Sequence, residues 1–169
     1  MTPRLGQLRT IDRVASAAFV TFIAVASVMS SAIAAPVVGY SFEFTQGTGQ
    51  PDLTLTPDAI SNAVLQGLRT GGITASSSPR TADAVVNVEV VASFEPEFQS
   101  LRIVSGTISL RGPRPGAANF ERPILLCQSS IQAWRTSQNS QDAAYKVRNG
   151  IMQQAAQFAQ RCRGELNGL

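Results

Sequence analysis

An alternating stretch at residues 83–94, DAVVNVEVVASF, decides the fold of this 169-residue chain. Val86 and Val88 fall on one side of an extended backbone, whereas Asn87 and Glu89 fall on the other, because successive strand side chains point to opposite faces. One face is therefore apolar and the other polar. This pattern is typical of a strand in an antiparallel sheet that packs on a core on one side only.

Further stretches on either side of this strand are rich in β-forming residues and bounded by turn residues. They are residues 37–45 (VVGYSFEFT), 101–111 (LRIVSGTISLR) and 123–135 (PILLCQSSIQAWR), with a short strand expected at 73–75. On the last of these strands, the inward face is expected to carry Leu125, Cys127, Ser129, Ile131 and Ala133. Trp134 then falls on the polar face.

Two amphipathic stretches predict helices. Thr56 is a good N-cap for the first, with Pro at the first helical position and Asp in the first turn, and Gly71 ends it. The second begins at Asn139 or Ser140 and is predicted to stop at Gly164. Apolar residues at helical spacing form one stripe on each helix. These are Ile60, Val64 and Leu68 in the first, and Ala144, Val147, Ile151, Ala155, Phe158 and Cys162 in the second.

The predicted order of elements is β-α-(β)-β-β-β-α. A mostly antiparallel sheet of four to five strands with both helices on one face makes a two-layer α+β sandwich. The other sheet face is polar enough to meet water. Residues 35–169 are long enough for one domain of this kind.

Residues 1–34 are predicted to be a signal peptide. They begin with three Arg and one Asp, continue with an apolar stretch at 14–29, and end in small residues. Ala32 and Ala34 suit cleavage after Ala34, so a periplasmic or secreted location without a membrane span is expected. An uncleaved membrane anchor is the alternative, because the uncharged stretch is long enough to span a bilayer.

The mature part of the chain is nearly neutral. Removing the leader's three Arg and one Asp from the 14 basic and 11 acidic residues leaves 11 basic and 10 acidic residues. The basic charge that nucleic-acid binding requires is therefore missing.

The two cysteines, Cys127 and Cys162, are predicted to form a disulfide, as an even pair in an exported protein does. Both lie on expected apolar faces. Two buried free thiols are the alternative. The sequence contains no His and no CxxC spacing, so we expect neither a metal site nor a cofactor.

Residues 58–91 carry a pattern of helix, loop and strand that resembles a known kind of domain. A helix ends in LRTGGI (68–73), a Ser-rich loop follows, and ADAVVNVEV (82–90) opens the next strand. This stretch resembles small bacterial envelope domains, namely the lipoprotein activators of penicillin-binding proteins and the N-terminal domain of the Tol-Pal propeller protein. The resemblance implies envelope localisation and protein–protein binding. The lipoprotein Cys of the activators is absent here, and their binding residues have no counterpart.

Two loops are predicted to contact a partner protein. The first carries aromatic area and negative charge, and the second carries positive charge and one aromatic ring. Their residues are Phe94, Glu95, Glu97 and Phe98 in the first, and Arg111, Arg114, Phe120 and Arg122 in the second. Successive loops of an antiparallel meander lie at opposite ends of the sheet, which predicts an acidic aromatic end and a basic end. The alternative is that each Phe folds back onto the core.

The sequence favours a small exported binding module that acts by protein–protein contact with an envelope or extracellular protein. The alternative function is a carrier of a small apolar ligand, with a pocket lined by Phe42, Phe44 and Phe158. An enzyme is not expected, because a chain without His lacks the commonest general base. A carboxylate-based hydrolase is the third possibility. It would need a cleft in which Glu89, Glu95 or Glu97 converges on another carboxylate.

Overall fold

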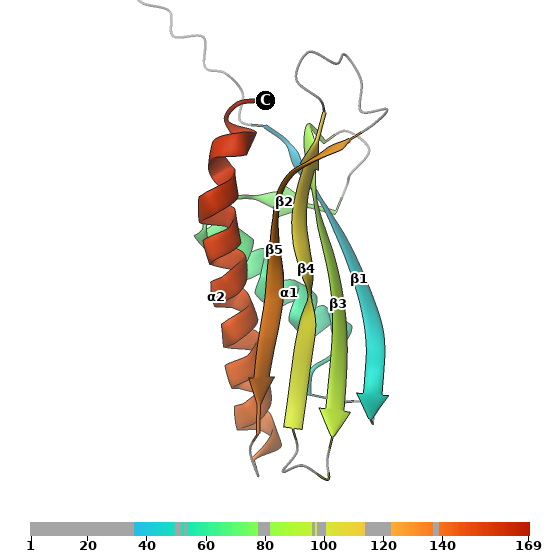
Figure 1. Cartoon of the computed structure of the whole chain (residues 1–169). Helices are drawn as coiled ribbons and strands as arrows, with labels where there is room; N and C mark the ends of the chain where they lie inside the picture. Colours follow the sequence, from blue (N-terminus) through green and yellow to red (C-terminus); the bar gives the residue numbers. More distant parts are fainter. Residues whose placement is uncertain are drawn as a thin grey trace, which may run out of the picture. The chain divides into compact units, whose positions relative to one another are not determined.

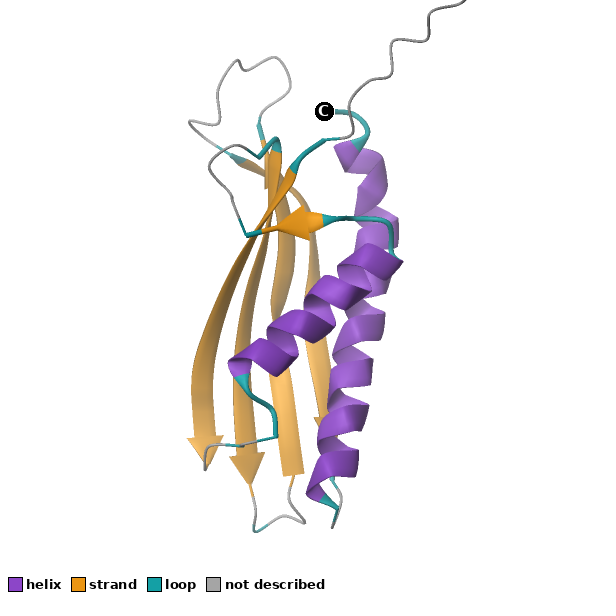
Figure 2. Cartoon of the chain, turned by 180° about the vertical axis from the view of Figure 1, so that it is seen from behind, coloured by secondary structure: helices purple, strands orange, loops and turns teal. Residues whose placement is uncertain are grey.

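The computed structural model describes residues 36–49, 52, 54–77, 82–95, 97, 101–113, 123–136 and 139–169, all within one compact unit, Ala34–Leu169. A five-stranded sheet of order β2-β1-β3-β4-β5 carries both helices on the same face (Figures 1 and 2). The elements in chain order are β1 (Val38–Gly49), α1 (Pro57–Thr70), β2 (Ala75–Ser76), β3 (Ala84–Glu95), β4 (Leu101–Gly112), β5 (Ile124–Arg135) and α2 (Ser140–Leu166). The predicted α+β sandwich is confirmed.

The sheet combines an antiparallel meander with a parallel pair. β3, β4 and β5 pair antiparallel along their full lengths. β1 pairs with β3 in parallel, and the two-residue β2 pairs with β1 in parallel. The parallel pairing follows from chain order, because α1 lies between β1 and β3 and returns the chain to the same end of the sheet.

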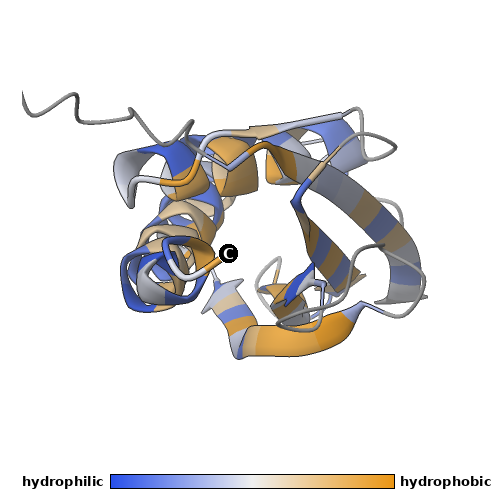
Figure 3. Cartoon of the chain, turned by 90° about the horizontal axis from the view of Figure 1, so that it is seen from above, coloured by the Kyte–Doolittle hydropathy of each residue, from blue (hydrophilic) through white to orange (hydrophobic). Residues whose placement is uncertain are grey.

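The core lies between the inward sheet face and the helices. On β3, Val86, Val88 and Val90 are buried while Glu89 between them is exposed, as the alternation predicted. The same alternation appears as bands of opposite hydropathy along the strands (Figure 3). The predicted stripe of α2 is buried along its whole length. Tyr40 on β1 reaches the Ser61 hydroxyl at 3.1 Å, and burial raises the pKa of Tyr40 to about 12 despite this bond.

Two predictions about single residues are wrong. Leu125 is 49% exposed instead of inward. The register shifts at this point, since Leu110 pairs with Cys127 while Arg111 pairs with Leu125, and the extra residue of this bulge reverses the alternation. Gly164 does not end α2, which continues to Leu166.

α1 and α2 approach each other very closely. A Cβ atom on Gly67 would lie 2.3 Å from the Met152 carbonyl oxygen, and one on Gly71 would lie 2.4 Å from the Ala156 carbonyl oxygen. The two glycines therefore permit a helix contact that no larger residue would allow. Within the described segments, no helix is long and apolar enough to cross a membrane.

The predicted disulfide joins Cys127 of β5 to Cys162 of α2, with a Cα–Cα distance of 5.8 Å. Cys162 is completely buried. The bond pins the last helix to the edge strand of the sheet.

Candidate interaction surface

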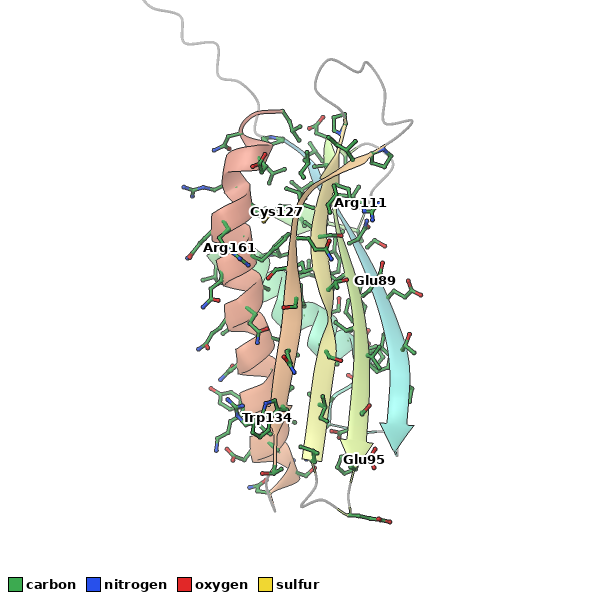
Figure 4. All side chains as sticks on the ribbon, viewed as in Figure 1. Glu89, Glu95, Arg111, Cys127, Trp134 and Arg161 are labelled. Atoms are coloured by element: carbon green, nitrogen blue, oxygen red, sulfur yellow. A yellow bond between two sulfur atoms is a disulfide. The ribbon has the colours of Figure 1, made fainter. Side chains whose placement is uncertain are left out.

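The outer face of the sheet, which no described helix covers, carries an apolar patch formed by Val91, Ile103 and Trp134. Trp134 is 56% exposed and Val91 is 41% exposed. Trp134 on β5 is in register with Ile103 on β4, and Val91 on β3 lies diagonally across from Ile103. Side chains at these register positions are neighbours on one face of the sheet, so the three residues belong to one surface. Figure 4 labels Trp134 near the lower end of β5.

A hollow of about 210 Å³ lies beside Trp134, between β5 and α2. We call it the glutamine hollow, because four glutamines are among its lining residues. They are Gln132 of β5 with Gln153, Gln154 and Gln157 of α2. Lys146 and Arg135 also line it and give it positive charge. A large exposed ring beside a polar hollow can anchor a partner side chain.

The Gln154 side chain closes the free edge of β5 at one position. Its amide nitrogen donates to the Gln132 carbonyl oxygen at 2.7 Å, and its amide oxygen accepts from the Gln132 backbone N–H at 2.8 Å. The amide thereby takes the place of a neighbouring strand. An edge strand protected in this way does not offer these groups to an added strand. The backbone groups of Gln132 are therefore already paired within the protein.

The predicted acidic aromatic end is only partly exposed. The Arg102 guanidinium carbon lies 4.6 Å from the centre of the Phe94 ring, and Phe94 is partly buried. This matches the alternative in which the ring folds back. Glu95 is partly buried, Glu97 is exposed, and Phe98 lies outside the described residues.

The predicted basic end is represented by Arg111, which is exposed. Arg114, Phe120 and Arg122 lie outside the described residues. Glu95 pairs with Leu101 at one end of β4, and Arg111 lies near the other end. The ten residues between Leu101 and Arg111 span roughly 33 Å in a strand. The two charged ends are thus well separated, and Figure 4 shows Glu95 and Arg111 at opposite ends of the sheet.

Glu89 has a carboxylate neighbour that the sequence reasoning missed. Glu43 of β1 is in register with Glu89 of β3, and both line an open hollow of about 260 Å³ on the outer face. The alternation of β1 already placed Glu43 on the polar face, but its neighbour depends on the parallel pairing. Both carboxylates are exposed to solvent.

The residues of the predicted apolar carrier pocket belong to the core. Phe158 is completely buried, and Phe42 and Phe44 pack against the core from its edge. None of the four hollows described between residues 36 and 169 is lined by these rings. Among the residues that the structure describes, no group of three or more Cys, Asp or Glu is placed to hold a metal ion.

Comparison with known proteins leaves the family open. No protein-family model and no curated protein matches the chain. Among solved structures, a PelC dodecamer from Paraburkholderia phytofirmans is 15% identical with a TM-score of 0.40, covering 78% of this chain and 86% of its own. A DUF330 protein from Xanthomonas campestris is 8% identical with a TM-score of 0.48, covering 79% and 89%. A minor lipoprotein from Acinetobacter baumannii is 16% identical with a TM-score of 0.38, covering 77% and 95%.

These likenesses are too distant to assign a family or a function. They also do not show the resemblance of residues 58–91 to the lipoprotein activators or to the Tol-Pal propeller protein.

Proposed function

We propose that this protein is an exported binding module without catalytic activity that contacts a partner protein through the apolar patch and the glutamine hollow. The observation that carries the proposal is Trp134, whose ring is more than half exposed on a sheet face. Tryptophan is enriched among the residues that dominate binding energy at protein interfaces. Large exposed apolar groups rimmed by polar residues mark such interfaces.

The disulfide supports the exported location. Cys127 and Cys162 are paired, and such bonds persist in oxidising compartments and are rare in the cytosol. This agrees with the leader predicted at residues 1–34. The location remains part of the proposal, and the intact mass of the native protein tests it. A native product that still begins at Met1 and carries two free thiols would contradict export.

The charged ends of the sheet would form the rim of the contact. Arg111 lies near one end of the sheet, and Glu95 and Glu97 lie at the other. Rim charges steer encounter and fix orientation more than they add affinity. We therefore expect Arg111→Glu to slow association, with a smaller effect on dissociation.

The proposal is tested by photo-crosslinking in the cells that make the protein. A photoreactive residue at Gln132, in the glutamine hollow, is expected to capture one defined partner. The same residue at Asn62, on the helix side, serves as the spatial control. Mass spectrometry identifies the captured protein, which is then purified for direct binding measurements.

Two aromatic variants provide the decisive comparison. Trp134 is 56% exposed and Tyr145 on α2 is 57% exposed, so the two rings are matched in exposure but lie on different surfaces. Trp134→Ser is expected to weaken partner binding at least about thirtyfold, a ~2 kcal/mol hot-spot effect. Tyr145→Ser should leave the affinity unchanged. Loss of binding in Tyr145→Ser alone would place the contact on the helix side and contradict the proposal.

A further inference from the structure

A groove of about 550 Å³ opens between α1 and α2, away from the apolar patch. The helices touch where Gly67 faces the Met152 carbonyl group. From that contact they diverge toward their N-terminal ends, as Figure 2 shows. The groove occupies the angle between them, and its volume lies within the ~300–1,000 Å³ range of small-molecule sites. We call it the helix groove.

The helix groove has small and apolar residues in its lining together with many polar ones. Ala59, Ala63 and Met152 are the apolar members, and the two alanines leave space because their side chains are short. The polar members come from both walls. They are Thr56, Asp58, Asn62 and Gln66 from α1 and its cap, and Tyr145, Arg148 and Asn149 from α2. Polar residues thus outnumber apolar ones in the lining, which suits a ligand that is itself polar and charged.

The two charged residues of the helix groove have opposite signs and stand on opposite walls. Arg148 belongs to α2 and Asp58 to the first turn of α1. The Nε atom of Arg148 is buried and has no hydrogen-bond partner in the protein. A buried donor in this state is costly, and each such group in a native protein calls for an explanation. Because this Nε atom has almost no accessible surface, a ligand carboxylate in the groove would bind the terminal Nη nitrogens of Arg148 instead.

We propose that the helix groove binds a small dipolar ligand of the amino acid or short-peptide class. Its carboxylate binds Arg148, and its ammonium group binds Asp58, which can only accept hydrogen bonds when ionised. The amides of Asn62 and Asn149 donate to and accept from the peptide groups of the ligand. The site shares no residue with the apolar patch or the glutamine hollow, so it is independent of the proposed protein contact.

Calorimetric titration of the purified protein with L-alanyl-L-alanine tests the proposal. We expect saturable binding that weakens at least about tenfold when the dipeptide carries a C-terminal amide, and again when its amine is acetylated. Arg148→Gln should abolish the discrimination against the amide, and Asp58→Asn the discrimination against the acetylated form. Arg161→Gln is the matched control, since this exposed arginine of α2 contacts Ser129 on β5 instead.

The outcomes separate cleanly. Absence of saturable binding at up to about 10 mM dipeptide overturns the proposal. Equal weakening in Arg148→Gln and Arg161→Gln would reduce it to a general charge effect and also overturns it. Equal affinity for the free and the doubly blocked dipeptide would exclude a dipolar ligand. Should Arg148→Gln fail to fold, Asp58→Asn with the acetylated probe still decides, because Asp58 is exposed.

Discussion

Removing the carboxylate of Asp52 is predicted to destabilise the protein more than removing the arginine that it binds. Arg102 is 1% exposed, and its Nε donates to Asp52 Oδ2 at 2.5 Å. The guanidinium also donates to the Ser140 hydroxyl and stacks on the Phe94 ring at 4.6 Å. One side chain thus ties the loop before α1, the end of β3 and the start of α2 together.

The two losses of stability differ because each variant leaves a different charged group without its partner. Asp52→Ala leaves a buried guanidinium without its carboxylate, which costs about 3 kcal/mol, the lower end of the ~3–5 kcal/mol range, since Ser140 and Phe94 still contact it. Arg102→Met keeps the aliphatic packing of the side chain. The Asp52 carboxylate that remains is 10% exposed and still accepts from the Thr54 backbone N–H at 2.8 Å and its hydroxyl at 2.6 Å. We therefore expect Arg102→Met to lower the free energy of unfolding by about 2 kcal/mol.

Urea unfolding followed by circular dichroism measures both variants and the double variant. The double variant should cost at least about 1 kcal/mol less than the two single losses together, since the partners are in contact. The exposed pair Asp142–Lys146 is the control, and Lys146→Gln should change stability by less than about 0.5 kcal/mol. Losses below about 0.5 kcal/mol in both core variants, or strict additivity, would refute the reasoning.

Three other perturbations have definite expected results. Gly67→Ala should lower the free energy of unfolding by about 2–3 kcal/mol in thermal unfolding, because its Cβ would meet the Met152 carbonyl oxygen at 2.3 Å. Gly164→Ala is the control. A Cβ atom there meets nothing within 4 Å, so this variant should raise the free energy of unfolding by up to about 1 kcal/mol. Replacing Cys127 and Cys162 by Ala opens a loop with a sequence separation of 35 and should cost about 4 kcal/mol in urea unfolding; a loss under about 1 kcal/mol would contradict this. The pKa of Tyr40 is about 10 in the unfolded chain, and burial raises it to about 12 in the folded protein. Stability should therefore fall by up to about 2 kcal/mol as pH rises from 10 to 12, because the unfolded chain loses this proton first. Tyr40→Phe should not show this fall.

Most of the fold could be predicted from periodicity, since burial on one face is written directly into the alternation of β3 and the stripe of α2. The parallel pairing of β1 with β3 was also within reach, because a helix between two strands implies a crossover connection. The bulge that exposes Leu125 could not be predicted, because the apolar residues around it fit either strand register equally well. α2 continues past Gly164 because this glycine does not adopt the positive φ with which a glycine ends a helix, and the C-cap is Asn167 instead.

The candidate surfaces were less predictable than the fold. The alternation of β5 placed Trp134 on the polar face, but its neighbour Ile103 depends on strand register, and the glutamine hollow depends on how α2 docks. Phe94 appeared as a contact residue because nothing local in the sequence pairs it with Arg102, eight positions further on. Which residues become neighbours on a surface depends on how strands and helices pair, and a single sequence does not specify that pairing.

α2 would give the proposed contact surface a fixed shape. Its Cys162 is bonded to β5, and its Gln154 amide is bonded to both backbone groups of Gln132. The same helix is therefore attached to the edge strand at two positions, Cys127 and Gln132, and these attachments fix the wall of the glutamine hollow. A partner that binds beside Trp134 meets side chains whose backbone is already ordered, so little conformational entropy remains to be lost on binding. Preorganisation depends on both attachments: if reducing the disulfide and replacing Gln154 by Ala left partner affinity unchanged while loosening α2, preorganisation would not be the source of the binding energy.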